Sequence, residues 1–143
     1  MLCLPAIWPQ STEKLTVGQT QKVVGKRNAA VSTKIPVSIL AGFHVNSDKP
    51  LDKDLIPLSI TWSSLGALQG AQVTFPKPET ITVAGEKTLV YTGDIELGVS
   101  FKVAANAPAG PGVASGKLLY QACNDRSCFP PKKIDINVPY QVQ

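Results

Sequence analysis

The chain has 143 residues, 43% of them hydrophobic, so it is long enough to bury a self-sufficient core as one domain. Its 14 Lys and Arg residues against 10 Asp and Glu give a formal charge of +4, and no basic run exceeds two residues. Nucleic-acid binding needs clustered positive charge with aromatic side chains placed to stack on bases, so we expect no such partner. No stretch reaches the roughly 20 apolar residues that span a bilayer, so no direct membrane insertion is expected.

The first nine residues are apolar and give way to polar sequence at Gln10. This change is typical of the tail of a secretory signal whose charged start is missing, and a disordered arm is the alternative. Cys3 and Trp8 fall in this segment and are assigned to the leader. A lipid-attachment role for Cys3 is disfavoured because no lipobox precedes it. We therefore predict a remnant of a signal peptide or a disordered arm over residues 1–12 and a single domain over residues 13–143.

The rest of the chain has the pattern of short β-strands. Its 11 Gly and 12 Pro interrupt it too often for long helices. Clear period-two alternation covers residues 37–45, 58–62, 95–103 and 134–142, and weaker strands are expected at 15–24, 71–75, 79–83, 87–92 and 113–123. Seven or more short strands separated by turns predict an all-β fold, an immunoglobulin-like antiparallel β-sandwich. A jelly roll or an open barrel is the alternative.

The residues capable of chemistry gather in the segment Tyr-Gln-Ala-Cys-Asn-Asp-Arg-Ser-Cys-Phe-Pro-Pro, residues 120–131. Residues 113–123 and 128–138 are the expected arms of a hairpin with a four-residue turn between them. Cys123 and Cys128 would then face each other with Cα atoms about 4.5 Å apart, within disulfide range. A ring of six residues stabilises by roughly 2 kcal/mol, against ~4–5 for a loop of about 100 residues. The pair is thus better suited to reactivity than to stability, with a structural disulfide as the alternative.

The residues around the cysteines set the electrostatics and the shape of this segment. Arg126 would favour a thiolate and Asp125 would disfavour it, so the sign of the thiol pKa shift stays open. Pro130 and the proline after it cannot donate to a sheet ladder, which predicts an irregular edge beside Cys128. Phe129 is either an apolar docking surface on that edge or a core residue.

His44 is the sole histidine, in an alternating strand. No cluster of Cys, His and carboxylates has ligand spacing, so no metal site is predicted. A role as base for a cysteine requires the fold to bring the two together, and a packed or surface strand residue is the ordinary interpretation. Trp62 is expected in the core. No phosphate-binding loop or nucleophile elbow is present, and no cofactor is expected.

The run Tyr-Gln-x-Cys-x4-Cys-x-Pro-Pro near the end of a β-rich domain resembles the N-terminal periplasmic domain of the DsbD family of thiol:disulfide interchange proteins. Residues 42–47, 49–50 and 55–57 also resemble early strands of that domain, and the resemblance covers roughly residues 15–140. It implies an immunoglobulin-like periplasmic domain whose dithiol takes electrons from a membrane-linked thioredoxin-like donor. The acceptors would be oxidised periplasmic thioredoxin-fold proteins, such as disulfide isomerases and cytochrome-maturation thioredoxins.

By this resemblance the chain is a protein-disulfide reductase component. Cys128 would form mixed disulfides with partners and Cys123 would resolve them. The neighbouring residues Tyr120, Gln121, Phe129 and Pro130 are the candidate partner-binding residues.

Two features depart from the family pattern. The segment nearest to the family's cap loop, residues 79–86, lacks its aromatic residues and most of its acids. The transmembrane and C-terminal thioredoxin-like parts are also missing from this sequence, so electrons are expected from a separate protein or a longer parent chain. The rival hypothesis is a non-enzymatic β-sandwich that binds a protein or a polysaccharide and keeps the disulfide as a local staple.

Overall fold

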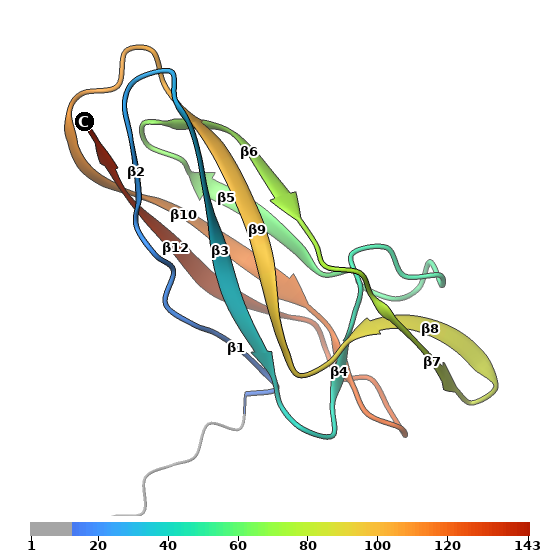
Figure 1. Ribbon diagram of the computed structural model, residues 1–143. Helices are drawn as coiled ribbons and strands as arrows, with labels where there is room; N and C mark the ends of the chain where they lie inside the picture. Colours follow the sequence, from blue (N-terminus) through green and yellow to red (C-terminus); the bar gives the residue numbers. More distant parts are fainter. Residues whose placement is uncertain (1–12) are drawn as a thin grey trace, which may run out of the picture.

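The computed structural model describes residues 13–143, and every regular element in this range is a β-strand, as the sequence predicted (Figure 1). The proposed leader, with Cys3 and Trp8, lies outside the described residues. The strands are β1 (Leu15–Val17), β2 (Val23–Gly25), β3 (Ala30–Ile39), β4 (His44–Asn46), β5 (Ser59–Ser64), β6 (Leu68–Thr74), β7 (Glu79–Val83), β8 (Glu86–Tyr91), β9 (Asp94–Val103), β10 (Gly110–Tyr120), β11 (Ala122–Cys123) and β12 (Lys132–Val142).

Three four-stranded sheets form an immunoglobulin-like sandwich with an extension at one end. The two sheets of the body have the orders β1-β3-β9-β6 and β2-β12-β10-β5, and the third has the order β11-β4-β8-β7. All neighbouring strands are antiparallel except β2 and β12, which are parallel. The third sheet lies at the end of the molecule opposite the C-terminus, at the bottom of the view in Figure 1.

Period-two alternation gives each long strand one apolar face, which packs into the core, because alternate side chains of a strand point to the same face. In β9 and β12 the apolar positions turn inward and the polar ones turn outward, which confirms the two clearest strand predictions. Trp62 is partly buried and packs edge-on against Phe101 at 5.3 Å between ring centroids. The inward-facing residues of these two strands are Leu97, Val99, Phe101, Val103, Ile136, Val138, Tyr140 and Val142.

Segments with uninterrupted alternation are divided where the chain passes between sheets. The predicted strand 37–45 ends at Ile39 and resumes at His44 in the third sheet. Between them Gly42 has a φ of +86°, and the Phe43 amide donates to the Leu40 carbonyl at 3.1 Å. The predicted strand 15–24 is likewise divided into β1 and β2, which belong to different sheets. Local alternation therefore locates the strands but not these crossings.

Candidate functional site

The two cysteines close a short loop between β11 and β12. Cys123 and Cys128 are paired as an isolated antiparallel bridge and joined by a disulfide, with their Cα atoms 4.0 Å apart. Asn124 shapes the turn, since its backbone N–H donates to the Ser127 carbonyl at 2.9 Å. Its Oδ1 accepts the backbone N–H groups of residues 126 and 127, also at 2.9 Å. Such side-chain bonds to the backbone two and three residues on are the usual reason for asparagine in turns. The four-residue turn is therefore as predicted.

The hairpin behind the loop carries an irregularity. β10 and β12 pair regularly up to Tyr120 and Lys132. Between that pair and the cysteine bridge, the arm with Phe129 and the two prolines is one residue longer than the opposite arm. The Phe129 amide still donates to the Ala122 carbonyl at 2.8 Å. The proline pair thus ends the ladder beside the cysteines, as the missing N–H groups require.

The two cysteines differ in accessibility. Cys123 is 3% exposed, whereas Cys128 is exposed. A protein of any size that approaches the loop therefore meets Cys128 first. Cys128 is thus the outer cysteine of the pair, and Cys123 is the inner one.

The third sheet places His44 beside the buried cysteine. In the pairing of β4 with β11, His44 lies directly opposite Cys123. Directly opposed residues of an antiparallel pair project to the same face with Cβ atoms about 4.5–5.5 Å apart. His44, Cys123 and Cys128 therefore form one row across neighbouring backbone segments. His44 is 7% exposed, and this burial lowers its pKa, while the charge of Asp125 acts in the opposite direction.

Gln121 holds the cysteine loop to the rest of the third sheet. Its Oε1 accepts hydrogen bonds from Asn46 Nδ2 and from the Ile56 amide, both at 3.0 Å. Its Nε2 donates to the Phe129 carbonyl at 3.4 Å. One side chain thus connects β4, the segment before β5 and the residue after Cys128. Sequence reasoning placed Gln121 at the site but gave no sign of these three partners.

A cavity of about 340 Å³ lies over the disulfide. One wall is the cysteine loop, and the other is the tip of the hairpin formed by β7 and β8. Val83 pairs with Glu86, and the two residues between them, Ala84 and Gly85, have φ values of +51° and +83°. Two positive φ angles in a two-residue hairpin loop are the signature of a type I′ turn. The segment compared with the family's cap loop is therefore a tight hairpin that reaches the cysteine cavity.

An aromatic cluster lies next to Cys128, outside the lining of this cavity. The rings of Phe43 and Phe129 meet edge to face at 5.8 Å between centroids. Lys14 Nζ lies 4.3 Å from the centroid of Phe129 and 5.6 Å from that of Phe43. Both rings are half-buried, and Pro130 next to them is exposed. We call these four residues the Phe43–Phe129 ledge.

The four candidate partner-binding residues differ in burial and in position. Phe129 and Pro130 belong to the ledge, beside Cys128. Tyr120 is 2% exposed, its pKa is raised mainly by burial, and within residues 13–143 its hydroxyl has no hydrogen-bond partner. Gln121 is half-buried and bonded as above. Tyr120 thus lies beneath the surface, whereas Gln121 is partly accessible and also supports the loop.

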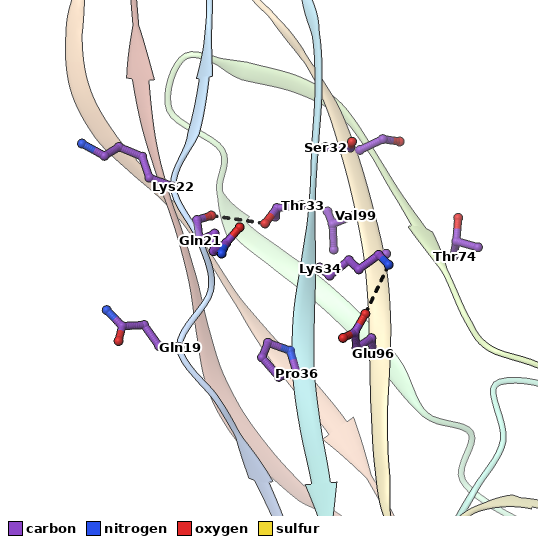
Figure 2. A pocket seen from close by; sticks show the side chains of 12 residues that line it. Gln19, Gln21, Lys22, Ser32, Thr33, Lys34, Pro36, Thr74, Glu96 and Val99 are labelled. Atoms are coloured by element: carbon purple, nitrogen blue, oxygen red, sulfur yellow. Dashed lines mark hydrogen bonds and ion pairs between the residues drawn. The ribbon is translucent and has the colours of Figure 1, made fainter.

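A larger cavity, of about 590 Å³, lies away from the cysteines, between β3, β9 and the segment from Gln19 to Lys22 (Figure 2). Its lining is mostly polar. Thr33 Oγ1 donates to the Gln21 carbonyl at 3.2 Å, and Lys34 pairs with Glu96 at 3.3 Å. Neither a cysteine nor a histidine is among its lining residues, so the cavity offers no nucleophile or base of the kind found at the cysteine site.

The part of the chain from residue 13 to residue 143 contains no group of three or more His, Cys, Asp or Glu side chains that could hold a metal ion. It also has no helix of the length and apolarity that crossing a membrane demands.

Comparison with known proteins identifies the family. The family model for the thiol:disulfide interchange protein DsbD, N-terminal, matches residues 11–139. Among solved structures, the N-terminal periplasmic domain of ScsB from Proteus mirabilis is similar with a TM-score of 0.67 and 16% identity, over 92% of this chain and 48% of that chain. This chain thus spans about half the length of that ScsB domain.

The Neisseria meningitidis DsbD N-terminal domain in the reduced form is a second similar structure, with a TM-score of 0.48 and 20% identity, over 82% of this chain and 86% of that chain. No curated protein matches. The match of the family model over residues 11–139 shows that the chain belongs to the DsbD N-terminal family of thiol–disulfide exchange domains.

Proposed function

We propose that this chain is a periplasmic domain that relays electrons through Cys123 and Cys128 from a membrane-linked thioredoxin-like donor to oxidised thioredoxin-fold proteins. The observation that carries the proposal is the disulfide itself, which pairs an exposed cysteine with a buried one in a chain of this family. A short ring with one accessible sulfur suits repeated opening and closing. It adds only about 2 kcal/mol as a staple.

The exchange proceeds in two displacements. In the reduced domain the Cys128 thiolate attacks one sulfur of a partner's disulfide, and the other partner sulfur leaves as a thiolate that takes a proton. Cys123, as a thiolate, then attacks Cys128 Sγ in the mixed disulfide. The Cys123–Cys128 bond forms, and the partner's second sulfur leaves and is protonated. The partner gains two electrons and two protons, and the donor's dithiol later restores the domain by the same steps in reverse.

The Phe43–Phe129 ledge is the proposed contact surface for these partners. It lies beside the exposed Cys128, and it combines two half-buried rings with an exposed proline and a cation. A thioredoxin-like partner whose reactive cysteine reaches Cys128 must cover this surface. Apolar contact there would orient the two sulfurs without any cofactor.

Single-cysteine variants test the proposal. We make them in the full chain with Cys3→Ser, so that Cys123 and Cys128 are the only thiols that can react. Each reduced variant is mixed with oxidised thioredoxin. Cys128→Ser should abolish reduction of the acceptor and keep the fold. Cys123→Ser should accumulate a mixed disulfide that thiol trapping and non-reducing electrophoresis detect. Full transfer by Cys128→Ser would refute the assignment.

The rival hypothesis, a binding module with a structural disulfide, predicts a different outcome. A staple that matters for stability would cause a large loss of melting temperature on reduction and no exchange with thioredoxin. The proposed function predicts a loss that corresponds to about 2 kcal/mol and rapid exchange. Calorimetry on the oxidised and reduced chain, together with the rate of exchange with thioredoxin, separates the two.

A further inference from the structure

The buried position of Cys123 raises a chemical problem for the second displacement. A thiolate and not a thiol is the nucleophile, and burial in apolar surroundings raises the pKa of a thiol. Cys123 is 3% exposed, with the buried residues Ala122 and Val45 around it in the pairing of β11 with β4. Water has little access to remove its proton. The resolving cysteine therefore needs a proton acceptor within the protein.

The row across the third sheet supplies one candidate at the required place. His44 is directly opposite Cys123 on β4, and Cys128 is directly opposite Cys123 on the other side. All three residues line the same 340 Å³ cavity. His44 is also the only histidine of the chain. A neutral imidazole in this position can accept the thiol proton on one side of Cys123 while the sulfur attacks on the other.

We propose that His44 is the general base that deprotonates Cys123 and so speeds the resolution of the mixed disulfide on Cys128. This role rests on the proposed exchange function and specifies how its second displacement works. His44 takes the proton of the Cys123 thiol and becomes an imidazolium. The Cys123 thiolate attacks Cys128 Sγ, the Cys128–partner bond breaks, and the leaving partner thiolate receives the proton from His44 or from water. In this step one S–S bond forms as another breaks, and the proton of Cys123 replaces the one that the partner thiolate takes up, so no further reagent is needed.

The charges around His44 suit this cycle. Burial lowers its pKa, so the imidazole is neutral and ready to accept a proton at neutral pH. Asp125 raises the same pKa and thereby stabilises the imidazolium once it forms. The other charged residues that line the cavity are Asp52 before β5, Glu86 and Lys87 on β8, and Arg126 in the cysteine loop.

The test separates the two displacements with one small disulfide, 5,5′-dithiobis(2-nitrobenzoate). The reduced full chain, with Cys3→Ser, is mixed with one equivalent in a stopped-flow instrument. Attack by Cys128 releases the first thionitrobenzoate, and attack by Cys123 on the mixed disulfide releases the second. The two absorbance phases therefore report on the two cysteines in turn.

The expected result concerns the second phase alone. At pH 7, His44→Gln should slow it by about tenfold or more, because general bases commonly contribute larger factors than this, and should leave the first phase unchanged. In the parent chain the second-phase rate should be nearly flat above the pKa of His44. In His44→Gln it should rise about tenfold per pH unit until the Cys123 thiol ionises by itself, and the two proteins should converge at high pH.

Two further variants sharpen the readout. Lys87→Gln changes a charge in the same cavity outside the row and should leave the pH slope of the second phase as in the parent. Asp125→Asn keeps His44 in place and removes the charge that raises its pKa. The fall in second-phase rate on acidification should therefore move to lower pH. This variant tests the proposal even where His44→Gln does not fold.

The outcomes distinguish the base from the exchange function. A second phase in folded His44→Gln with the parent's pH profile, or one slowed equally at every pH, would overturn the role of His44 and leave the exchange function intact. An acid limb that Asp125→Asn leaves unmoved would also overturn it. A parent chain that releases no second equivalent would contradict the exchange function, and with it the role of His44.

Discussion

The body of the sandwich and the sheet at its end are built on different rules. The body has strands of up to 11 residues, β10 and β12 among them, with aliphatic side chains inward and polar ones outward. In the end sheet β4 has three residues and β11 two, and every one of them is buried, His44 and Asn46 included. Regular alternation thus accounts for the core, whereas the candidate chemistry lies where the strands are too short to alternate.

The two cavities repeat this contrast. The larger one, of about 590 Å³, lies on the body, where Figure 2 shows mostly polar side chains, among them Lys22 and the Lys34–Glu96 pair. The smaller one, of about 340 Å³, holds the disulfide and the histidine. Cavity volume therefore does not locate the candidate site in this molecule, whereas the row of His44, Cys123 and Cys128 locates it.

The largest predicted effect is a loss of stability in the body of the sandwich that leaves the exchange rate at the cysteine site unchanged. Leu118 on β10 is fully buried, and Leu118→Ala should lower the free energy of unfolding by about 2–5 kcal/mol through lost burial and a cavity. Denaturant unfolding measures the loss. Under conditions where the variant is folded, its rate of exchange with thioredoxin should equal that of the parent. An exchange rate that falls in folded protein would show that the body and the site are coupled.

A smaller effect is expected when the end sheet is loosened. Gln121→Leu leaves the Ile56 amide without its acceptor, which should cost about 1–2 kcal/mol, and frees the Phe129 carbonyl from the loop's support. We expect slower exchange together with this modest loss of stability. Gln141→Leu is the matched control, because within residues 13–143 the Gln141 side chain donates only to the carbonyl of its neighbour Val142 on β12. Equal exchange rates in the two variants would argue against a supporting role for Gln121.

The smallest effect belongs to the large cavity. Lys34 and Glu96 are mostly exposed, and exposed ion pairs contribute little because water and salt screen them. Lys34→Ala should therefore change neither the melting temperature nor the exchange rate measurably. A clear loss of exchange would mean that this cavity takes part in partner binding and that the contrast between the two regions is wrong.

The sequence was informative where structure is local. Alternation predicted β9 and β12, and the strand at 79–83 has the predicted bounds. The composition of residues 124–127 predicted the turn, which Asn124 stabilises. It did not reveal that residues 37–45 cross between sheets at Gly42, since the apolar period continues through the turn. Such a crossing depends on which strand offers a partner, and that is a long-range property.

The site was predictable in part for the same reason. The spacing of Cys123 and Cys128 was enough to predict their pairing, because the two residues belong to one hairpin. The neighbourhood of His44 and Cys123, 79 positions apart in sequence, follows only from the pairing of β4 with β11. The three hydrogen bonds of Gln121 likewise join distant segments. A single sequence does not mark such long-range pairs.

The reduction potential of the Cys123–Cys128 pair tests the central claim most directly. The full chain with Cys3→Ser is equilibrated with defined thiol buffers, and the free thiols are trapped and counted. An exchange domain should have a potential above roughly −250 mV, within the range of known thiol–disulfide exchange proteins. A potential below about −300 mV is that of a structural disulfide and would contradict the account.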